Sequence, residues 1–533
     1  MTSPTPLLPP LTGRSTWFER LSGRAMANPA TARMLAWLAP ALVTVLAAVL
    51  RLVNLAHPHE IMFDETYYVK DSWSLWNLGY EAKWGDDADA QLADGDDSAM
   101  QTAGSFVVHP PLGKWIIALG MAAAGPGSSF GWRLTTALLG SLTVLLVYLV
   151  SLLLTRSRTA STIAGGLLAI DGLGIVMSRI ALLDGILTFF IMLGVLFVLL
   201  DRRRTLPLLD AIGTDDPPES PTQVTQLTRM AQVARMTGPV LWARPWLIAA
   251  GMAFGAATAV KWSGVYALAV FGLYVVVTDA LARRRAGIAL WPTDAVFRQG
   301  PASFLLLVGP ALLTYLMSWT GWLLTAGGYD RQTDANPFIA LWKYHEAILA
   351  FHVGLASPHP YASPAWQWPL LLRPTAIWVA DSPAPCGTDH CIAVISSVPN
   401  PLIWYAGVAA AAYLLYRFVR AMIQRQPIAP MLTFALVGLI ATYVPWLLVG
   451  NRTIFQFYTV VMVPFLVIAL AVALRELAGP KHAPLHRRQA GQRTVVVYLC
   501  VVVLVSAFYY PVWTGMSVPY EFWLIHNWLP GWI

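Results

Sequence analysis

The sequence predicts an all-α protein that crosses a membrane many times. Of its 533 residues, 57% are hydrophobic and only 12% are charged, which is about half the charged fraction of a soluble protein. Apolar runs of roughly 20 residues, long enough to cross a bilayer, recur along the chain. Most arginines lie in short loops between these runs, as in the cytoplasmic loops of membrane proteins. This pattern explains the net charge of +7 better than nucleic-acid binding does.

We expect eleven membrane-spanning helices, preceded by a cytoplasmic tail over residues 1–35 that is rich in Pro, Ser, Thr and Arg. The helices cover residues 36–55, 131–154, 158–177, 180–200, 246–261, 262–281, 303–324, 402–419, 429–449, 453–473 and 494–513. With the N-terminus in the cytoplasm, every Arg-rich loop then falls on the cytoplasmic side. The odd number of helices predicts that the C-terminal tail, residues 514–533, is external.

The remaining segments are expected to be loops. Residues 56–130 and 325–401 would face outward, and the apolar stretch 113–125, too short to span, would form an interfacial or re-entrant helix there. Residues 201–245, with the sequence TDDPPESPTQ, are typical of a flexible cytoplasmic connector. The acidic run 85–103 is expected to be a flexible, solvated insert.

Charged residues gather at the predicted outer ends of the helices, beginning with the adjacent carboxylates Asp64 and Glu65. The others are His109, Lys114, Arg133, Asp171, Arg179, Asp184, Lys261 and Arg452. A charge at the centre of a bilayer costs roughly 2.5–3.5 kcal/mol on insertion, so such residues are functional candidates. The acid pair is suited to take a proton from a group at the membrane surface. Arginine and lysine are suited to bind a lipid phosphate.

Structural roles are open alternatives for several of these residues. Arg133 and Arg452 could extend to the membrane interface without binding a ligand. Asp171 and Arg179 could form an internal ion pair between two helices. Lys261 is followed by a tryptophan and could be an interfacial anchor. The convergence of these residues on one surface favours a site more than any single residue does.

An aromatic, Pro-rich stretch in the second outer loop contains His359, Tyr361, Trp366 and Trp368. Such rings stack on sugars and peptides, but they also form belts at membrane interfaces, and composition alone favours the belt.

Cys386 and Cys391, in the same loop, favour a disulfide in an oxidising compartment, although His390 leaves a metal site as a weaker alternative. The motif His57-Pro58-His59-Glu60 lacks further ligands, so we expect no metal there. The DxD-like Asp87-Ala88-Asp89 lies in the acidic run, which we interpret as a solvated insert.

Seven motifs together resemble the protein O-mannosyltransferases. They are FDE at 63–65, HPPLGK at 109–114, GWRL around Arg133, SRIALLDG at 178–185, VKWSG at 260–264, HPYASPAWQWPLLLRP at 359–374 and NRTIFQFY at 451–458. They follow the family's order from about residue 50 to the last spans, and the chain looks like the bacterial, actinobacterial-type branch. The resemblance implies a GT-C glycosyltransferase fold, with the catalytic domain over 36–513.

The resemblance also implies an activity: transfer of mannose from polyprenyl-phosphate-mannose to Ser or Thr of exported proteins, with inversion. Asp64 would be the catalytic base and Glu65 its indispensable neighbour. Arg133, Lys261 and Arg452 would bind the donor phosphate and His109 would line the site. The aromatic stretch would line the sugar or acceptor. No cofactor or metal is expected.

The same resemblance implies a multi-pass plasma-membrane enzyme whose active site is extracytoplasmic and which could meet its acceptor at the secretion translocon. Three other functions remain open. One is a GT-C enzyme with another lipid-linked sugar or a glycolipid acceptor. A second is a transporter, against which stand the lack of an inverted repeat and the gathering of charges at one surface. A third is a structural subunit, which would leave the acid pair unexplained.

Overall fold

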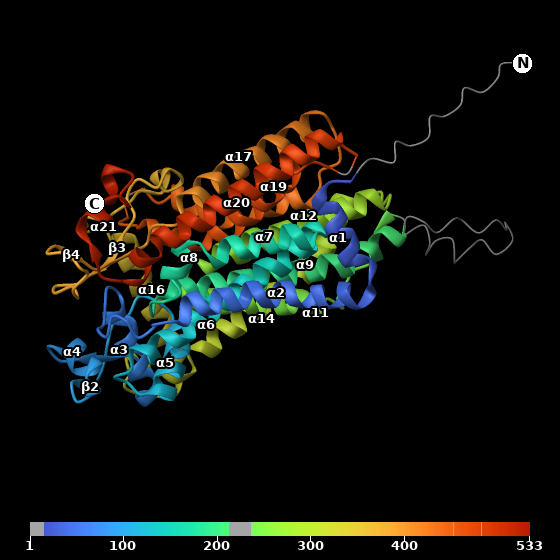
Figure 1. Ribbon diagram of the computed structural model, residues 1–533. Helices are drawn as coiled ribbons and strands as arrows, with labels where there is room; N and C mark the ends of the chain where they lie inside the picture. Colours follow the sequence, from blue (N-terminus) through green and yellow to red (C-terminus); the bar gives the residue numbers. More distant parts are fainter. Residues whose placement is uncertain (1–14, 213–235, 451, 481) are drawn as a thin grey trace, which may run out of the picture.

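Long helices lie side by side and form the body of the molecule, and short helices and strands cover one end of it (Figure 1). The computed structural model describes residues 15–212, 236–450, 452–480 and 482–533. The amphipathic helix α1 (Trp17–Ala27) lies at the opposite end of the bundle from the C-terminal segment (Figure 1). This arrangement is the one that an odd number of crossings requires.

Eight helices of the described chain are long and apolar enough to cross a membrane. They are α2 (Pro29–Leu52), α6 (Ser129–Thr155), α9 (Leu183–Ile212), α12 (Gly264–Arg285), α14 (Gly300–Ser318), α17 (Pro401–Ile423), α18 (Pro430–Leu447) and α20 (Leu485–Thr514). Helix α14 is extended at its N-terminal end by α13 (Trp291–Thr293) and a π-helical turn (Asp294–Gln299). Each of the eight coincides with a predicted span.

The other three predicted spans contain shorter helices, namely α7 (Arg158–Ala169), α11 (Pro245–Val260) and α19 (Val463–Leu477). The span predicted over 158–177 is broken, because Asp171 caps a new helix, α8 (Gly172–Val176), by accepting from the N–H of Gly174. The 3₁₀-helix η3 (Gln456–Val461) precedes α19. The count of eleven crossings therefore stays a prediction.

The second half of the predicted cytoplasmic tail, residues 1–35, is helical. Thr16 and Glu19 form a capping box that starts α1, and α2 already begins at Pro29. The first part of the predicted connector, residues 201–245, is also helical, because α9 continues to Ile212. Arg244 anchors the end of the connector through Asp201 and Asp279. Residues 213–235, where TDDPPESPTQ lies, are outside the described residues.

The first outer loop is ordered and contains α3 (Glu65–Leu78), β1 (Ala82–Trp84), α4 (Ala88–Ala93), β2 (Met100–Gly104) and α5 (Leu112–Ala124). The acidic run is therefore not the flexible insert that the sequence predicted. Strands β1 and β2 pair antiparallel across it. Leu92 of α4 is buried, and Asp97 accepts from the indole of Trp73. Helix α5 packs on α3 and α6.

The second outer loop contains a long helix that the sequence analysis missed, α16 (Pro337–Gly354), after the short α15 (Thr320–Leu324). It continues with the 3₁₀-helix η2 (Ala365–Leu370) and the strands β3 (Ala376–Val379), β4 (Cys391–Ile392) and β5 (Val394–Ser396). The C-terminal segment adds β6 (Val518–Pro519), α21 (Tyr520–Leu524) and η4 (Pro530–Trp532). β3 pairs with β5, and β4 pairs with β6.

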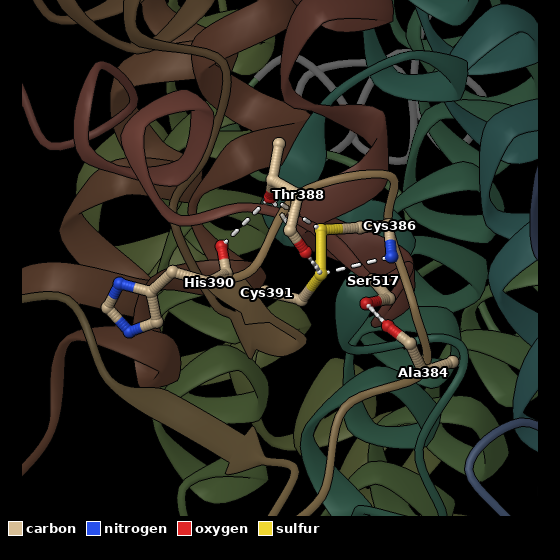
Figure 2. The surroundings of a disulfide bond; sticks show 6 residues. All are labelled: Ala384, Cys386, Thr388, His390, Cys391 and Ser517. Carbon is tan, nitrogen blue, oxygen red and sulfur yellow. Dashed lines mark hydrogen bonds between the residues drawn. A yellow bond between two sulfur atoms is a disulfide. The ribbon is translucent and has the colours of Figure 1, made fainter.

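The predicted disulfide between Cys386 and Cys391 is present (Figure 2). It closes a short loop in which the hydroxyl of Thr388 donates to the carbonyl of His390. The Ser517 hydroxyl donates to the Ala384 carbonyl, and the ring of His390 stacks on Tyr520. The disulfide loop is thereby fixed to the C-terminal segment.

Candidate active site

Asp64 lies at the start of α3, in the loop that follows the C-terminal end of α2. The preceding residue, Phe63, has a φ of +53°, a conformation that costs a non-glycine residue free energy and often marks a functional site. Its ring contacts Phe457 of η3. The Asp64 carboxylate has no hydrogen-bond or ion-pair partner among the described residues. It is therefore free to receive a proton from a substrate.

Glu65 occupies a contrasting environment, with 0% of its surface exposed. One carboxylate oxygen accepts from Arg133 Nε at 2.9 Å and from the N–H of Ala181 at 2.8 Å. The other accepts from Arg133 Nη2 at 2.8 Å and from the N–H of Met62 at 3.2 Å. Glu65 therefore joins the loop before α3 to α6 and to the turn before α9. Both of its carboxylate oxygens are thus engaged within the protein, and they fix the loop that carries Asp64.

Arg133, which the sequence predicts to bind the donor phosphate, is held by other residues of the protein, and its role toward the donor stays a prediction. Arg133 is fully buried, and besides Glu65 it donates to the carbonyls of Pro58 and Glu60 at 2.6 and 2.8 Å. Its donors are thus engaged by the loop that carries Asp64. The alternative, extension to the membrane interface, is also excluded by this burial. Arg133 and Glu65 form one buried unit that fixes the loop.

Lys261 is buried and does not reach the membrane interface as an anchor. Its ammonium lies 3.0 Å from both carboxylate oxygens of Asp184, in the first turn of α9. It also lies 4.2 Å from the centre of the Tyr458 ring, a cation–π contact. Asp184 therefore partly compensates the positive charge of Lys261 before any phosphate arrives.

Asp64 belongs to the same electrostatic environment as Lys261 and Asp184. Burial raises the pKa of the Asp64 carboxyl to about 6, while Lys261 lowers it and Asp184 raises it. A carboxylate with this pKa is ionised at neutral pH and is a stronger base than an exposed aspartate.

His109 lies in the buried interior of the outer loops, where its ring is 6.2 Å from Tyr68 and 5.5 Å from His352. Burial and then the nearby Lys261 hold the pKa of His109 well below its usual range, so it is neutral. Its Nδ1 atom is buried without a hydrogen-bond partner in the described chain. Lys114 explains the spacing of HPPLGK, because its ammonium donates to the His109 carbonyl at 3.1 Å and pairs with Glu81.

Arg452 is the one predicted phosphate ligand with no carboxylate partner among the described residues. Its Nη2 donates to Nδ1 of His352 at 3.1 Å, and its Nε is buried without a partner in the same residues. His352, on α16, donates from Nε2 to the Val108 carbonyl at 2.9 Å, which leaves Nδ1 as the acceptor for Arg452. Burial lowers the pKa of His352 to about 4, so it stays neutral.

A cavity of about 300 Å³ lies beside Arg452. Its walls include Ser363, Ala365, Trp366, Trp446 and Ile454. The cavity therefore combines a guanidinium that has no carboxylate partner in the described chain with a mainly apolar lining, which suits the phosphate and the first prenyl units of a lipid.

The aromatic stretch is only partly placed as predicted. Trp368 is 0% exposed and its indole donates to the Ser363 carbonyl at 2.9 Å, so it packs in the interior, and its predicted role in lining the sugar or acceptor stays a prediction. Trp366 is 59% exposed and lines the cavity. His359 is exposed beside Phe455. Tyr361 lies under the guanidinium of Arg373. Whether these three residues contact an acceptor stays a prediction.

The ion pair between Asp171 and Arg179, which was an open structural alternative, does not form among the described residues. Asp171 accepts from the N–H groups of Gly174 and Asn400. Arg179 donates to the carbonyls at the end of α2, including Val53 at 2.8 Å and Asn54 at 2.9 Å. Asp171 thus caps the start of α8, and Arg179 caps the C-terminal end of α2. Their charges are used in the architecture and not for a ligand.

Within the described residues, no group of three or more His, Cys, Asp or Glu could hold a metal ion. His57 bonds to the Gly515 carbonyl and His59 to the Ser129 hydroxyl, so their side chains serve the loop structure.

Three further side chains complete the site: Asp184, His352 and Tyr458. The sequence placed Asp184 at the correct surface but gave it no role. Tyr458 is the last residue of NRTIFQFY, so the motif contained it. His352 had no comparable signal, because α16 was not expected.

Two family models match the chain. The model of dolichyl-phosphate-mannose-protein mannosyltransferase matches residues 41–206. The model of the C-terminal four-transmembrane region of protein O-mannosyltransferase matches residues 337–532. Asp64, Glu65, Arg133 and Asp184 lie in the first region, and His352 and Arg452 lie in the second.

Similar proteins come from mycobacteria. The polyprenol-phosphate-mannose–protein mannosyltransferase of Mycolicibacterium smegmatis strain MKD8 is 30% identical over 519 residues, 93% of each chain. That of Mycobacterium tuberculosis strain H37Rv is 31% identical over 527 residues, 94% of this chain and 92% of the relative. Among solved structures, the Saccharomyces cerevisiae protein O-mannosyltransferase Pmt1–Pmt2 complex bound to the sugar donor matches with a TM-score of 0.67 at 16% identity. That match covers 93% of this chain and 92% of the yeast chain.

Proposed function

The chain belongs to the protein O-mannosyltransferase family, and from this premise we propose how its site transfers mannose from polyprenyl-phosphate-mannose to proteins. The observation that supports the proposal is that the two adjacent carboxylates, Asp64 and Glu65, have different partners. The Asp64 carboxylate has no partner among the described residues and lies in the electrostatic environment of Lys261 and Asp184, whereas Glu65 forms a buried ion pair with Arg133. The chain is a multi-pass membrane protein with a GT-C fold.

The reaction is a single displacement at the anomeric carbon. A Ser or Thr hydroxyl oxygen of the acceptor attacks that carbon, the bond to the phosphate oxygen breaks, and the hydroxyl proton passes to Asp64. Because attack and departure occur on opposite faces, a β-linked donor gives an α-mannoside. In inverting glycosidases, too, a carboxylate base activates the nucleophile on the face of the sugar opposite the leaving group. A base at this position contributes about 10²–10⁴-fold to the rate.

The leaving phosphate needs positive charge and no proton. Arg452 is suited to bind it, because its Nε is buried and unpartnered in the described chain and the adjacent cavity is apolar. His352 holds the guanidinium in place. Lys261 contributes a second positive charge, although Asp184 compensates part of it. Neutral His109, whose Nδ1 has no partner in the described chain, can accept a hydrogen bond from a sugar hydroxyl.

These cations can supply the charge stabilisation that a metal provides in other transferases, so the scheme has no metal step. We expect transfer to persist in the presence of EDTA. We place the site on the extracytoplasmic face of the plasma membrane, where exported polypeptides that emerge from the translocon would be the acceptors. The distribution of arginines supports this orientation.

The test is transfer by the purified chain in detergent or vesicles. Labelled polyprenyl-phosphate-mannose and a peptide with Ser and Thr are expected to give an α-mannosylated peptide, identified by digestion with anomer-specific mannosidases. An arabinose-linked donor and a glycolipid acceptor distinguish the other GT-C activities. The proposal would be refuted if product formed only with the arabinose-linked donor or only with the glycolipid acceptor. A β-linked product would also refute it.

A further inference from the structure

A second cavity, of about 390 Å³, lies between the C-terminal end of α17 and the N-terminal end of α18. Its lining includes Tyr413, Tyr416, Arg417, Arg420, Gln426 and Leu432. Since α17 begins beside the active-site loops and runs away from them, this cavity is at the opposite end of the bundle (Figure 1). The distribution of arginines predicts that this end is cytoplasmic.

One wall of the cavity is fixed by a charged cluster. Arg417 Nη1 lies 2.6 Å from a carboxylate oxygen of Glu476, and the Tyr413 hydroxyl donates to the same oxygen at 2.6 Å. These bonds join α17 to the end of α19. They hold Arg417 and Tyr413 in place without a ligand, so the cavity wall is preformed.

Arg420 provides the free charge of the cavity. It is exposed, lies one turn beyond Arg417 on α17, and its side chain has no hydrogen-bond or ion-pair partner among the described residues. The amide of Gln426 is likewise unpartnered within those residues. The cavity also meets the N-terminal turn of α18, where Ala429 gives no side-chain cap. The free donors therefore outnumber the acceptors, which favours an anion.

The surroundings distinguish a lipid from a soluble anion. Large apolar side chains of α17 next to the cavity are exposed: Leu415, Val419, Met422 and Ile423. Tyr416, 57% exposed, is both a cavity wall and part of this surface. Tyrosines are typical of the level of lipid headgroups. A lipid could thus place its headgroup in the cavity and its acyl chains along α17.

We propose that this cavity binds the phosphodiester headgroup of an anionic membrane lipid in the leaflet opposite the active site. Arg420 and Gln426 would donate to the phosphodiester, and Arg417 would add charge from the fixed wall. Basic pockets between membrane helices on the cytoplasmic side commonly bind anionic headgroups. The volume of about 390 Å³ accommodates a phosphate with a glycerol.

The experiment titrates delipidated full-length protein in detergent with phosphatidylglycerol and follows bound lipid by native mass spectrometry. Arg420→Gln is expected to weaken binding about tenfold, the loss of one hydrogen-bonded charge. Arg425→Gln is the matched control, because Arg425 is exposed in the same loop but does not line the cavity; its binding should match the wild type. Gln426→Ala is a second, uncharged probe and should weaken binding. Mannosyl transfer at the wild-type rate reports that each variant is folded.

Phosphatidylcholine and inorganic phosphate separate the possible ligands. Weaker binding of phosphatidylcholine, and failure of phosphate to displace phosphatidylglycerol, support the anionic-lipid site. Displacement by phosphate would show a soluble-anion site and overturn the proposal. Unchanged binding in both Arg420→Gln and Gln426→Ala, or an equal loss in Arg425→Gln, would also overturn it.

Discussion

Replacing Glu65 with Gln tests the different roles of the two adjacent carboxylates. The Glu65 carboxylate compensates Arg133, and neither side chain is exposed. Glutamine is neutral and has one acceptor oxygen in place of two, so Arg133 would become an uncompensated buried charge. Removing one partner of a buried ion pair costs about 3–5 kcal/mol. We expect Glu65→Gln to lose stability of this size and, because the loop before Asp64 loosens, to lose transfer as well.

The assay combines unfolding of the purified protein in detergent with the transfer rate. Arg133→Met leaves Glu65 unpaired and should be destabilised to a similar degree. The double variant removes both charges, so its loss should be smaller than the sum of the two single losses by about 1–3 kcal/mol. Lys343→Gln is the control, because it breaks the exposed pair with Asp334 and should leave stability unchanged.

One result would refute this assignment of Glu65. If Glu65→Gln keeps wild-type stability and still loses transfer, Glu65 acts in the chemistry and not as a support. Additive losses in the double variant would also contradict the view that Glu65 and Arg133 form one unit.

Three other predictions concern the phosphate, the base and the outer loop. Arg452→Gln should lower kcat/KM for the lipid donor about 10²-fold without changing the KM for the peptide, measured by steady-state kinetics; an unchanged donor dependence would exclude Arg452 from the phosphate site. Because the pKa of Asp64 is raised to about 6, the base is ionised above that pH, so the rate profile of kcat/KM should be level above about pH 7 and fall tenfold per unit below about pH 5; a level profile down to pH 4 would contradict this. Replacing Cys386 and Cys391 with Ser should destabilise by about 2 kcal/mol, as expected for so short a loop, and should increase hydrogen exchange at β6 while transfer persists; unaltered exchange would show that the disulfide does not fix β6.

The sequence predicted the long helices well because each is a continuous apolar run of sufficient length. It failed where polar groups end a helix inside such a run, as Asp171 does by capping α8. It also missed α16, because its aromatic and basic residues resemble an interfacial loop. The ordered acidic run depends on contacts such as that of Asp97 with Trp73, which composition does not reveal.

For the site, the sequence located the correct surface but not the pairing of its charges. Arg133 and Lys261 are each neutralised by a carboxylate 68 and 77 positions away along the chain. A single sequence does not show which distant charges meet, so both residues looked free to bind phosphate. The same limitation hid the bond from Arg452 to His352.

The most direct test of the central claim is single-turnover transfer by Asp64→Asn, with the donor bound in advance. The account predicts that donor binding is retained and that the transfer step slows about 10²–10⁴-fold, because the acceptor hydroxyl loses its base. Asp86→Asn, an exposed acid in the same outer loop, should transfer at the wild-type rate. Near-wild-type transfer by Asp64→Asn would contradict the account.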